Sequence, residues 1–477
     1  MGDSASAVTT AAIKYKPLQS SEIRLVKLKP RQQWRTKVCV ELVHRSLRSH
    51  PRYLALSYVW GESGPTKAIR VNGQPYGIPQ NLHDALTYIA EEFDALASVL
   101  PGFKMRPNSE DGSIYAAAYS TVIWLGQHVL VKCQLAAHIA KTVSDVILDQ
   151  PVQNQLWPGQ LVVDGPNTLR WKMDGAGPIG SMPETVLRNF LEEFEDILYA
   201  DWWWRVWVLQ EYVRSQREPI FLPGQFQCSG LIRIHAIILK LPQEVKDLHL
   251  LRISALTARI ISVLSLVHHR DDFALAGSIS LAEQLFRALE LKTTCDSTVS
   301  HDHIYGLLGM VDVSQLPVEM RPDYEKPFGD VCQEYARLII EGLGNLDVLS
   351  QGSQRLVGNP SWVPDLRDSG CYNNQERLLI QKGFMDILLS GTSLLVDNGA
   401  LFIVDTSTVP VDVGDEFWAL KGSSFLSILR PSAVGNGTFE LIGRGRHVAG
   451  TVSVGFDGSR IKKAFWEKRT CYPVTLI

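Results

Sequence analysis

The pattern of apolar and polar positions is clearest around residues 53–61, which read Tyr-Leu-Ala-Leu-Ser-Tyr-Val-Trp-Gly and are almost all apolar. A short apolar run with aromatic and β-branched residues, closed by glycine, predicts a buried central strand followed by a turn. In an open α/β sheet, ligands bind beyond the carboxyl ends of the strands. The pocket mouth is therefore predicted at Ser57, Tyr58, Trp60 and Gly61. The alternative is that the two aromatic residues belong to the core, where large aromatic side chains are usually found.

The segments on either side of this run show strand and helix patterns. Residues 23–28 and 38–43 alternate apolar and polar positions, which predicts two strands. Asn72-Gly73 is a type I′ turn signal and predicts a β-hairpin. A helix is predicted to begin within residues 79–81, because apolar residues then recur at three- and four-residue spacing. Asn81 either caps this helix or faces the pocket.

Further elements follow along the chain. Residues 121–126 predict a second buried strand, and helices are expected at 133–148, 190–198 and 202–212, the last capped by Asp201. Glycine, proline and polar residues mark 94–112 and 151–183 as loops. We expect a loose start over 1–20, an α/β domain over 21–228, a helical region over 229–350, and a connector with a β-rich domain over 351–477.

Composition narrows the class of protein. A chain of 477 residues is too long for one core, and 45% hydrophobic with 20% charged residues is typical of a soluble globular protein. A net charge of −3 argues against nucleic-acid binding. No signal-like start and no run of about 18–20 uninterrupted apolar residues occurs, so we expect a cytoplasmic protein without a membrane span. The seven scattered cysteines form no C-x-x-C pair, and no metal site is predicted.

The strongest candidate for chemistry is the sequence Trp207-Val-Leu-Gln-Glu211. Residues four apart share a helix face, so Trp207 and Glu211 are predicted neighbours, with Arg205 on a different side. A carboxyl group beside a large indole tends to have a raised pKa and can act as an acid, a base or a charge stabiliser. The alternative is an ordinary amphipathic helix with a salt-bridged glutamate.

At 301–303, His-Asp-His offers too few ligands for a metal, and Asp302 is expected to cap a short helix. The polar residues 268–272 are expected to form an interhelical turn.

Several blocks resemble the fungal heterokaryon incompatibility (HET) domain, in the order of that family. They lie at residues 53–61, 69–73, 78–86, 114–126, 202–211, 302–309, 323–324 and 360–365. The resemblance implies a role in fungal non-self recognition, with growth arrest or cell death on contact between incompatible partners. It also implies a protein partner or self-association. Residues 94–112 depart from the family, which has a strand and a cysteine-containing turn there. Either the gene model has misread a splice junction or the block has been lost, and in both cases we expect an incomplete pocket and a surface loop.

HET domains resemble in turn the Toll/interleukin-1-receptor (TIR) fold, a flavodoxin-like parallel sheet flanked by helices. Many TIR domains cleave NAD with a glutamate that follows a Trp-Cys-x-x-Glu pattern. Trp207 and Glu211 keep this spacing, with Val208 in place of the cysteine. The resemblance therefore implies Glu211 as a catalytic residue, with Ser57, Tyr58, Trp60, Gly61, Asn81, Arg205 and Trp207 around a nucleotide. NAD would be a substrate, and no resident cofactor is expected. A HET protein without enzymatic activity, serving this or another fungal pathway, remains the alternative.

Overall fold

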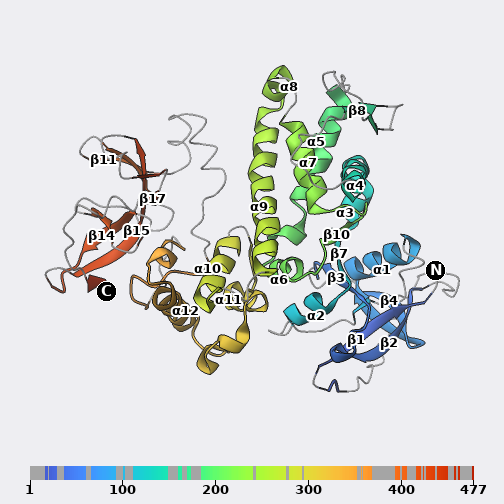
Figure 1. Ribbon diagram of the computed structural model, residues 1–477, viewed down its shortest axis with the longest axis horizontal. Helices are drawn as coiled ribbons and strands as arrows, with labels where there is room; N and C mark the ends of the chain where they lie inside the picture. The colour runs from blue at the N-terminus through green and yellow to red at the C-terminus, as the bar shows by residue number, and fades with distance from the viewer. Residues whose placement is uncertain are drawn as a thin grey trace, which may run out of the picture. The chain divides into compact units, whose positions relative to one another are not determined.

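The structure is a computed structural model in which two compact units comprise residues 1–267 and 268–477 (Figure 1). Both are mixed structures of helices and strands. The described residues are 17–19, 21–29, 37–60, 66–92, 100–101, 111–148, 160–163, 169–172, 184–239, 243–274, 279–292, 295–351, 356, 358–367, 393–397, 400–404, 415–420, 423, 426–435, 438–449, 456–457, 460–461 and 475–476. The predicted loose segment at 1–20 lies almost wholly outside them.

The first unit opens with a five-stranded sheet in the order β5-β4-β2-β1-β6. Its strands are β1 (Glu22–Leu28), β2 (Cys39–Ser46), β4 (Thr66–Val71), β5 (Gln74–Pro79) and β6 (Leu100–Pro101). The two strands predicted by alternation, β1 and β2, are confirmed and pair antiparallel. The predicted β4–β5 hairpin is also confirmed, because Asn72 and Gly73 both have positive φ, 52° and 83°, as a type I′ turn requires.

A separate parallel sheet has the order β10-β7-β3. Its strands are β3 (Leu54–Tyr58), β7 (Ser120–Trp124) and β10 (Ile220–Leu222). Both predicted buried strands, β3 and β7, are confirmed. The central strand of the three is β7, however, because it pairs with β10 on one side and β3 on the other. The prediction that residues 53–61 form the central strand is therefore wrong within the described part of the chain.

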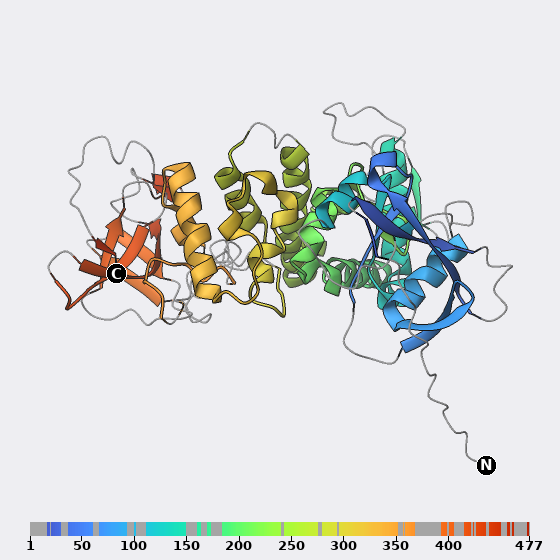
Figure 2. The ribbon, with the colours of Figure 1, turned by 90° about the horizontal axis from the view of Figure 1, so that it is seen from below.

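The two faces of β3 belong to different cores, because successive side chains point to opposite sides of a strand. Leu54 and Leu56 lie in one apolar cluster with α1 (Gln80–Glu92) and part of the first sheet. Figure 2 shows α1 lying against the first sheet, where it contacts β4 and β5. Tyr53 and Ala55 lie in a second cluster, against α2 (Asp111–Ala117). A strand covered on both faces reads as a continuous apolar run, which is why its pattern was so clear.

The strand that the family has between these two, and that residues 94–112 were expected to lack, is not needed to complete their pairing. Leu54 to Tyr58 pair directly with Ser120 to Trp124. Of the segment 94–112, the structure describes only Leu100–Pro101, which pairs with β1, and the first residues of α2. The rest of the predicted surface loop lies outside the described residues. The same holds for most of 151–183, but that segment also contains a short hairpin of β8 (Gln160–Val163) and β9 (Leu169–Lys172).

Helices follow the parallel sheet. They are α3 (Gln127–Lys132), α4 (Gln134–Leu148), α5 (Glu184–Leu198), the 3-10 helix η3 (Asp201–Trp204), α6 (Trp207–Val213), α7 (Cys228–Ile238), α8 (Gln243–Leu248) and α9 (Leu250–Ala274). The helices predicted near 133–148 and 190–198 are confirmed as α4 and α5.

The single helix predicted at 202–212 is wrong. It is divided at Arg205, whose φ of −95° and ψ of 134° are extended. Asp201 is the first residue of η3 and not its cap, a position held by Ala200. The break lets Trp202 and Trp203 turn into the core, where both rings pack against Phe221 of β10.

The predicted turn at 268–272 is also wrong, since α9 continues through these residues to Ala274. Figure 1 shows α9 beside α5 and α7. Arg252 of α9 contacts Glu192 and Glu195 of α5, and the buried Arg259 donates through Nε to the Leu198 carbonyl at 2.9 Å. The polar residues at the end of α9 therefore extend a helix that is already anchored along its length.

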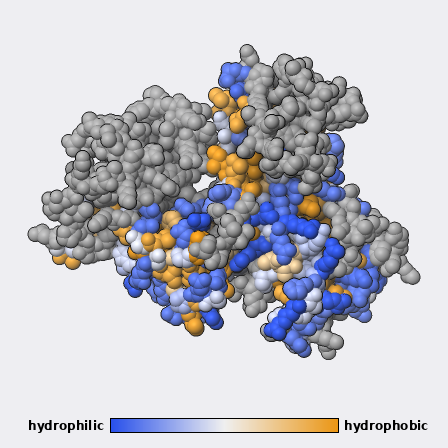
Figure 3. All heavy atoms as spheres, in the orientation of Figure 1, coloured by the Kyte–Doolittle hydropathy of each residue, from blue (hydrophilic) through white to orange (hydrophobic). Residues whose placement is uncertain are grey.

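By length and composition alone, residues Leu250–Arg270 of α9 are apolar enough to cross a membrane, with a mean hydropathy of 1.8. Core helices of soluble proteins meet the same criterion, and 39% of this segment is buried within the fold. Figure 3 shows apolar side chains gathered along α9. Leu250 and Leu251 are among its exposed leucines.

The second unit combines helices with a six-stranded sheet. Its main helices are α10 (Leu281–Leu291), α11 (Asp302–Tyr305) and α12 (Phe328–Leu343), joined by the 3-10 turns η6 (Leu308–Met310), η7 (Val313–Gln315), η8 (Val318–Met320) and η9 (Asp347–Ser350). Five strands of this sheet pair in the order β11 (Ser393–Asp397), β12 (Ala400–Val404), β15 (Thr438–Ala449), β14 (Leu426–Pro431) and β13 (Glu416–Ala419). The sixth strand, β18 (Thr475–Leu476), pairs with β15. β16 (Phe456–Asp457) and β17 (Arg460–Ile461) form a separate pair. The finer boundaries predicted after residues 228 and 350 stay predictions.

Candidate functional site

A chain of hydrogen bonds joins the carboxyl end of β3 to the helices after α5. Ser57, 1% exposed, donates from Oγ to the Glu211 carboxylate of α6. The same Oγ accepts a hydrogen bond from Trp202 Nε1 at 2.6 Å. Trp202 is fully buried, so the donor and acceptor positions of the serine are both held rigidly. Two predicted site residues separated by 154 positions, Ser57 and Glu211, are thus brought into direct contact.

Charged groups also surround Tyr58, the next residue of β3. Arg205 Nη1 lies 3.4 Å from the Tyr58 carbonyl oxygen, to which it donates. Burial raises the pKa of the Tyr58 hydroxyl, and the Glu211 charge raises that pKa further, while Arg205 opposes both effects. The tyrosine therefore stays protonated at neutral pH and can donate a hydrogen bond. Tyr58, Arg205 and Glu211 form one electrostatically coupled group.

The remaining predicted pocket residues are less tightly connected. The ring of Trp60 stacks on that of Tyr58 with centroids 6.0 Å apart, and Trp60 is 41% exposed. These two aromatic residues were predicted to lie either at a pocket mouth or in the core. The exposure of Trp60 fits a pocket mouth, whereas Tyr58 packs partly against the core. Trp207 is half-buried one helical turn before Glu211. Gly61 lies outside the described residues.

Asn81 faces the sheet. Its side chain donates to the Val59 carbonyl and accepts from Trp124 Nε1, each at 2.7 Å. It therefore ties α1 to the ends of both β3 and β7. The prediction that Asn81 caps this helix is wrong, since α1 begins at Gln80 and Asn81 lies within it. That Asn81 faces the pocket stays a prediction.

Trp202 and Trp124, which hold Ser57 and Asn81 in place, were not among the residues that the sequence predicted for the site. Helical spacing predicts Trp207, and not Trp202, as the tryptophan next to Glu211. The run of three tryptophans at 202–204 was a usable signal, since adjacent large aromatics seldom all lie on a surface.

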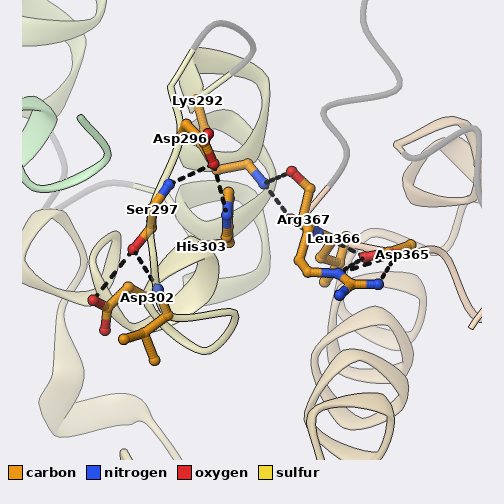
Figure 4. Close-up of polar contacts among 9 residues, drawn as sticks. Lys292, Asp296, Ser297, Asp302, His303, Asp365, Leu366 and Arg367 are labelled. Atoms are coloured by element: carbon orange, nitrogen blue, oxygen red, sulfur yellow. Dashed lines mark hydrogen bonds and ion pairs between the residues drawn. The ribbon is translucent and has the colours of Figure 1, made fainter. Parts of the chain in front are cut away.

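The polar motif around Asp302 belongs to the second unit (Figure 4). Asp302 lies inside the first turn of α11 and is not its cap. Its carboxylate accepts from Tyr324 at 2.8 Å and from Ser297 at 3.3 Å. His301 contacts the Lys326 carbonyl, while His303 pairs with Asp296, so the two imidazoles serve different partners.

We expect the second unit to lose stability as the pH falls below about 6.5, partly through His303. Burial, followed by the nearby Lys292 charge, lowers the pKa of His303 from its ordinary value of 6.5, and Asp296 and Asp365 oppose this only in part. Between the two pKa values, the unfolded chain binds more protons than the folded one. The stability present above pH 6.5 is therefore lost as the pH falls towards the folded pKa.

Thermal melting of the His303→Gln variant between pH 5 and pH 8 measures this contribution. The variant should show a flatter pH dependence than the parent, whereas His268→Gln, at an exposed histidine of α9, should follow the parent. Identical pH profiles for His303→Gln and the parent would contradict the assignment.

Comparison with known proteins gives two relevant matches. The family model described as "Heterokaryon incompatibility protein (HET)" matches residues 53–96. This segment includes Ser57, Tyr58, Trp60, Gly61 and Asn81, whereas Arg205, Trp207 and Glu211 lie beyond it. "Heterokaryon incompatibility protein 6, OR allele" of Neurospora crassa is 23% identical over 405 residues, covering 72% of this chain.

The match covers 58% of the Neurospora protein, so the chain spans less than two thirds of that relative's length. No solved structure matches this chain. The family match covers β3, the β4–β5 hairpin and α1. The relative extends the similarity over most of the chain. The chain therefore carries a match to the HET domain at residues 53–96, and over most of its length it is distantly similar to heterokaryon incompatibility protein 6.

Proposed function

We propose that this protein acts in fungal non-self recognition, leading to growth arrest or cell death between incompatible partners. The HET domain and the distant homologue support this role. A recognition role requires a further protein or a second copy of the chain as partner, and we propose the cytoplasm as its compartment.

We propose further that the first unit has a TIR-like arrangement whose site binds NAD and cleaves its glycosidic bond. The observation that carries this proposal is the contact between Ser57 and Glu211 at the carboxyl end of a parallel strand. Ligands of α/β sheets bind at such strand ends. Trp60, exposed and stacked on Tyr58, offers an aromatic surface for a base or a nicotinamide ring.

The chemistry assigned to Glu211 is electrostatic. When the bond between nicotinamide and ribose breaks, positive charge develops on the ribose, and a carboxylate held in place beforehand stabilises it. Ser57 would orient that carboxylate, and Arg205 would attract a phosphate of the substrate. Water then adds to the ribose, so the products are nicotinamide, ADP-ribose and a proton.

Glu211→Gln tests the proposal, because it keeps the size of the side chain and removes its charge. We expect the variant to lose NAD cleavage by at least about 100-fold, a typical loss when one preorganised group is removed. Purified protein is incubated with NAD, both as isolated and after forced oligomerisation, and nicotinamide release is followed by chromatography. Asp201→Asn is the matched control, since Asp201 is an exposed acid of the neighbouring η3.

Parent-level cleavage by Glu211→Gln would remove the catalytic role of this residue. A large fall in its melting temperature would instead indicate that Glu211 is structural.

The second candidate function is signalling by protein contact without catalysis. The exposed leucines Leu248, Leu250 and Leu251 of α8 and α9 favour it, because contiguous exposed apolar residues mark interaction surfaces. Intact NAD in the oligomerised parent protein would favour this candidate.

A further inference from the structure

The helices α3, α4 and α5 pack together in the first unit (Figure 1). Three side chains with metal-binding atoms meet there. His128 lies in the first turn of α3, Cys133 joins α3 to α4, and Asp196 lies in the last turn of α5. One ligand atom from each lies within 4.8 Å of the other two. His128 Nε2 and Asp196 Oδ2 are already 3.1 Å apart.

The surroundings of the cysteine favour a cation. Cys133 is fully buried, and the negative charges of Asp196 and Glu193 both act on its thiol. Glu193 is fixed by the Ala136 backbone N–H, which donates to its Oε2 at 2.9 Å. The positive charge of Lys132 opposes only part of the effect of these two negative charges. The buried sulfur therefore lies in an electrostatic environment that is negative on balance.

The types of ligand identify the metal class. Imidazole and thiolate bind Zn²⁺ strongly, whereas Mg²⁺ and Ca²⁺ prefer sites made of oxygen atoms alone. Ligand atoms on one tetrahedral zinc stand roughly 3.5 Å apart. His128 and Asp196 are about half exposed, at 53% and 47% of their side chains, so small rotamer changes can bring them closer. Their exposure also leaves solvent access for a fourth ligand.

We propose that His128, Cys133 and Asp196 bind one Zn²⁺ per chain, with water as the fourth ligand. Binding releases the thiol proton and replaces the contact between His128 and Asp196 with two bonds to the metal. The ion would join α3 to α5. Because α3 follows β7 after two residues, the metal would also hold the segment next to Trp124, which binds Asn81. This proposal does not depend on NAD cleavage.

The affinity of the full chain for zinc provides the first test. Protein freed of any affinity tag and of metal is titrated with Zn²⁺ in competition with a chromophoric chelator. We expect one equivalent to bind, and we expect His128→Ala and Asp196→Asn each to weaken binding by at least about tenfold. Both positions are half exposed, so these variants should fold. His138→Ala is the matched control, since His138 is an exposed histidine of α4.

The cobalt complex tests the sulfur ligand. Co²⁺ bound in place of zinc should show a sulfur-to-metal charge-transfer band in the near ultraviolet. Cys133→Ser should abolish this band, while Cys39→Ser should keep it. If Cys133→Ser fails to fold, the parent spectrum decides, because a complex without that band lacks a thiolate ligand. No stoichiometric binding, or binding that His128→Ala and Asp196→Asn leave unchanged, would overturn the proposal.

Discussion

Replacing Leu56 by aspartate is expected to prevent the chain from folding into soluble protein. Leu56 lies on β3 within the cluster formed by α1, β7 and the first sheet. An unpaired charge in such a core costs several kcal/mol even after relaxation. A typical domain is stable by about 5–15 kcal/mol in total, so this single change removes most of that margin. Expression of the variant, followed by measurement of the soluble fraction and the circular dichroism spectrum, checks the result.

Lys67→Asp is the matched control, because it introduces the same residue at an exposed position of β4. It should remain soluble with a spectrum like that of the parent. If Leu56→Asp also stays soluble with native-like circular dichroism, then β3 does not lie in the core and the parallel sheet described here is wrong.

Asn81→Ala is expected to destabilise the first unit by about 2–4 kcal/mol. The change removes both bonds of the side chain and leaves the indole N–H of Trp124, a fully buried residue, without its acceptor. A buried donor without a partner costs more than the net worth of an ordinary hydrogen bond. Urea unfolding, followed by tryptophan fluorescence and by circular dichroism, measures the change in the free energy of unfolding.

A double-mutant cycle isolates the bond itself. In the variant Trp124→Phe, the donor to Asn81 is absent, so a second change to Asn81→Ala should cost less than it does in the parent. We expect a coupling of about 1 kcal/mol or more between the two positions. Gln80→Ala, at an exposed amide next to Asn81, should change stability by less than about 0.5 kcal/mol. Strictly additive effects would contradict the Asn81–Trp124 bond.

These contacts give the candidate site its rigidity. Ser57 is held by Trp202, and Asn81 connects Val59 to Trp124. Four elements, β3, α1, β7 and η3, are therefore tied together at the end of β3, where Ser57 contacts Glu211. Variants that loosen this support should reduce any activity of the site even when Glu211 is unchanged, because a catalytic group displaced by about 1 Å can lose much of its effect.

The sequence by itself determined the strands, the hairpin and the helix whose conformation depends on residues close together in the chain. The apolar runs predicted β3 and β7, because a strand buried on both faces has few polar positions. Asn72-Gly73 predicted its hairpin, because few other residue pairs accept two positive φ angles. The spacing of Phe190, Leu191 and Phe194 predicted α5, since residues three and four apart share a helix face. In each case the determining interactions lie within a few residues.

Only the tertiary structure decided which distant residues meet. Sequence spacing paired Glu211 with Trp207, and the family resemblance implied only that Ser57 and Glu211 share a site. The fold brings Ser57 into contact with Glu211 and Trp202 into contact with Ser57. The position of β3 at the end of its sheet, the break at Arg205 and the role of Asn81 also depend on neighbours far along the chain. Helical and strand periodicity describe one element at a time. The contact between two elements depends on how their faces pack, and that information is spread over the whole chain.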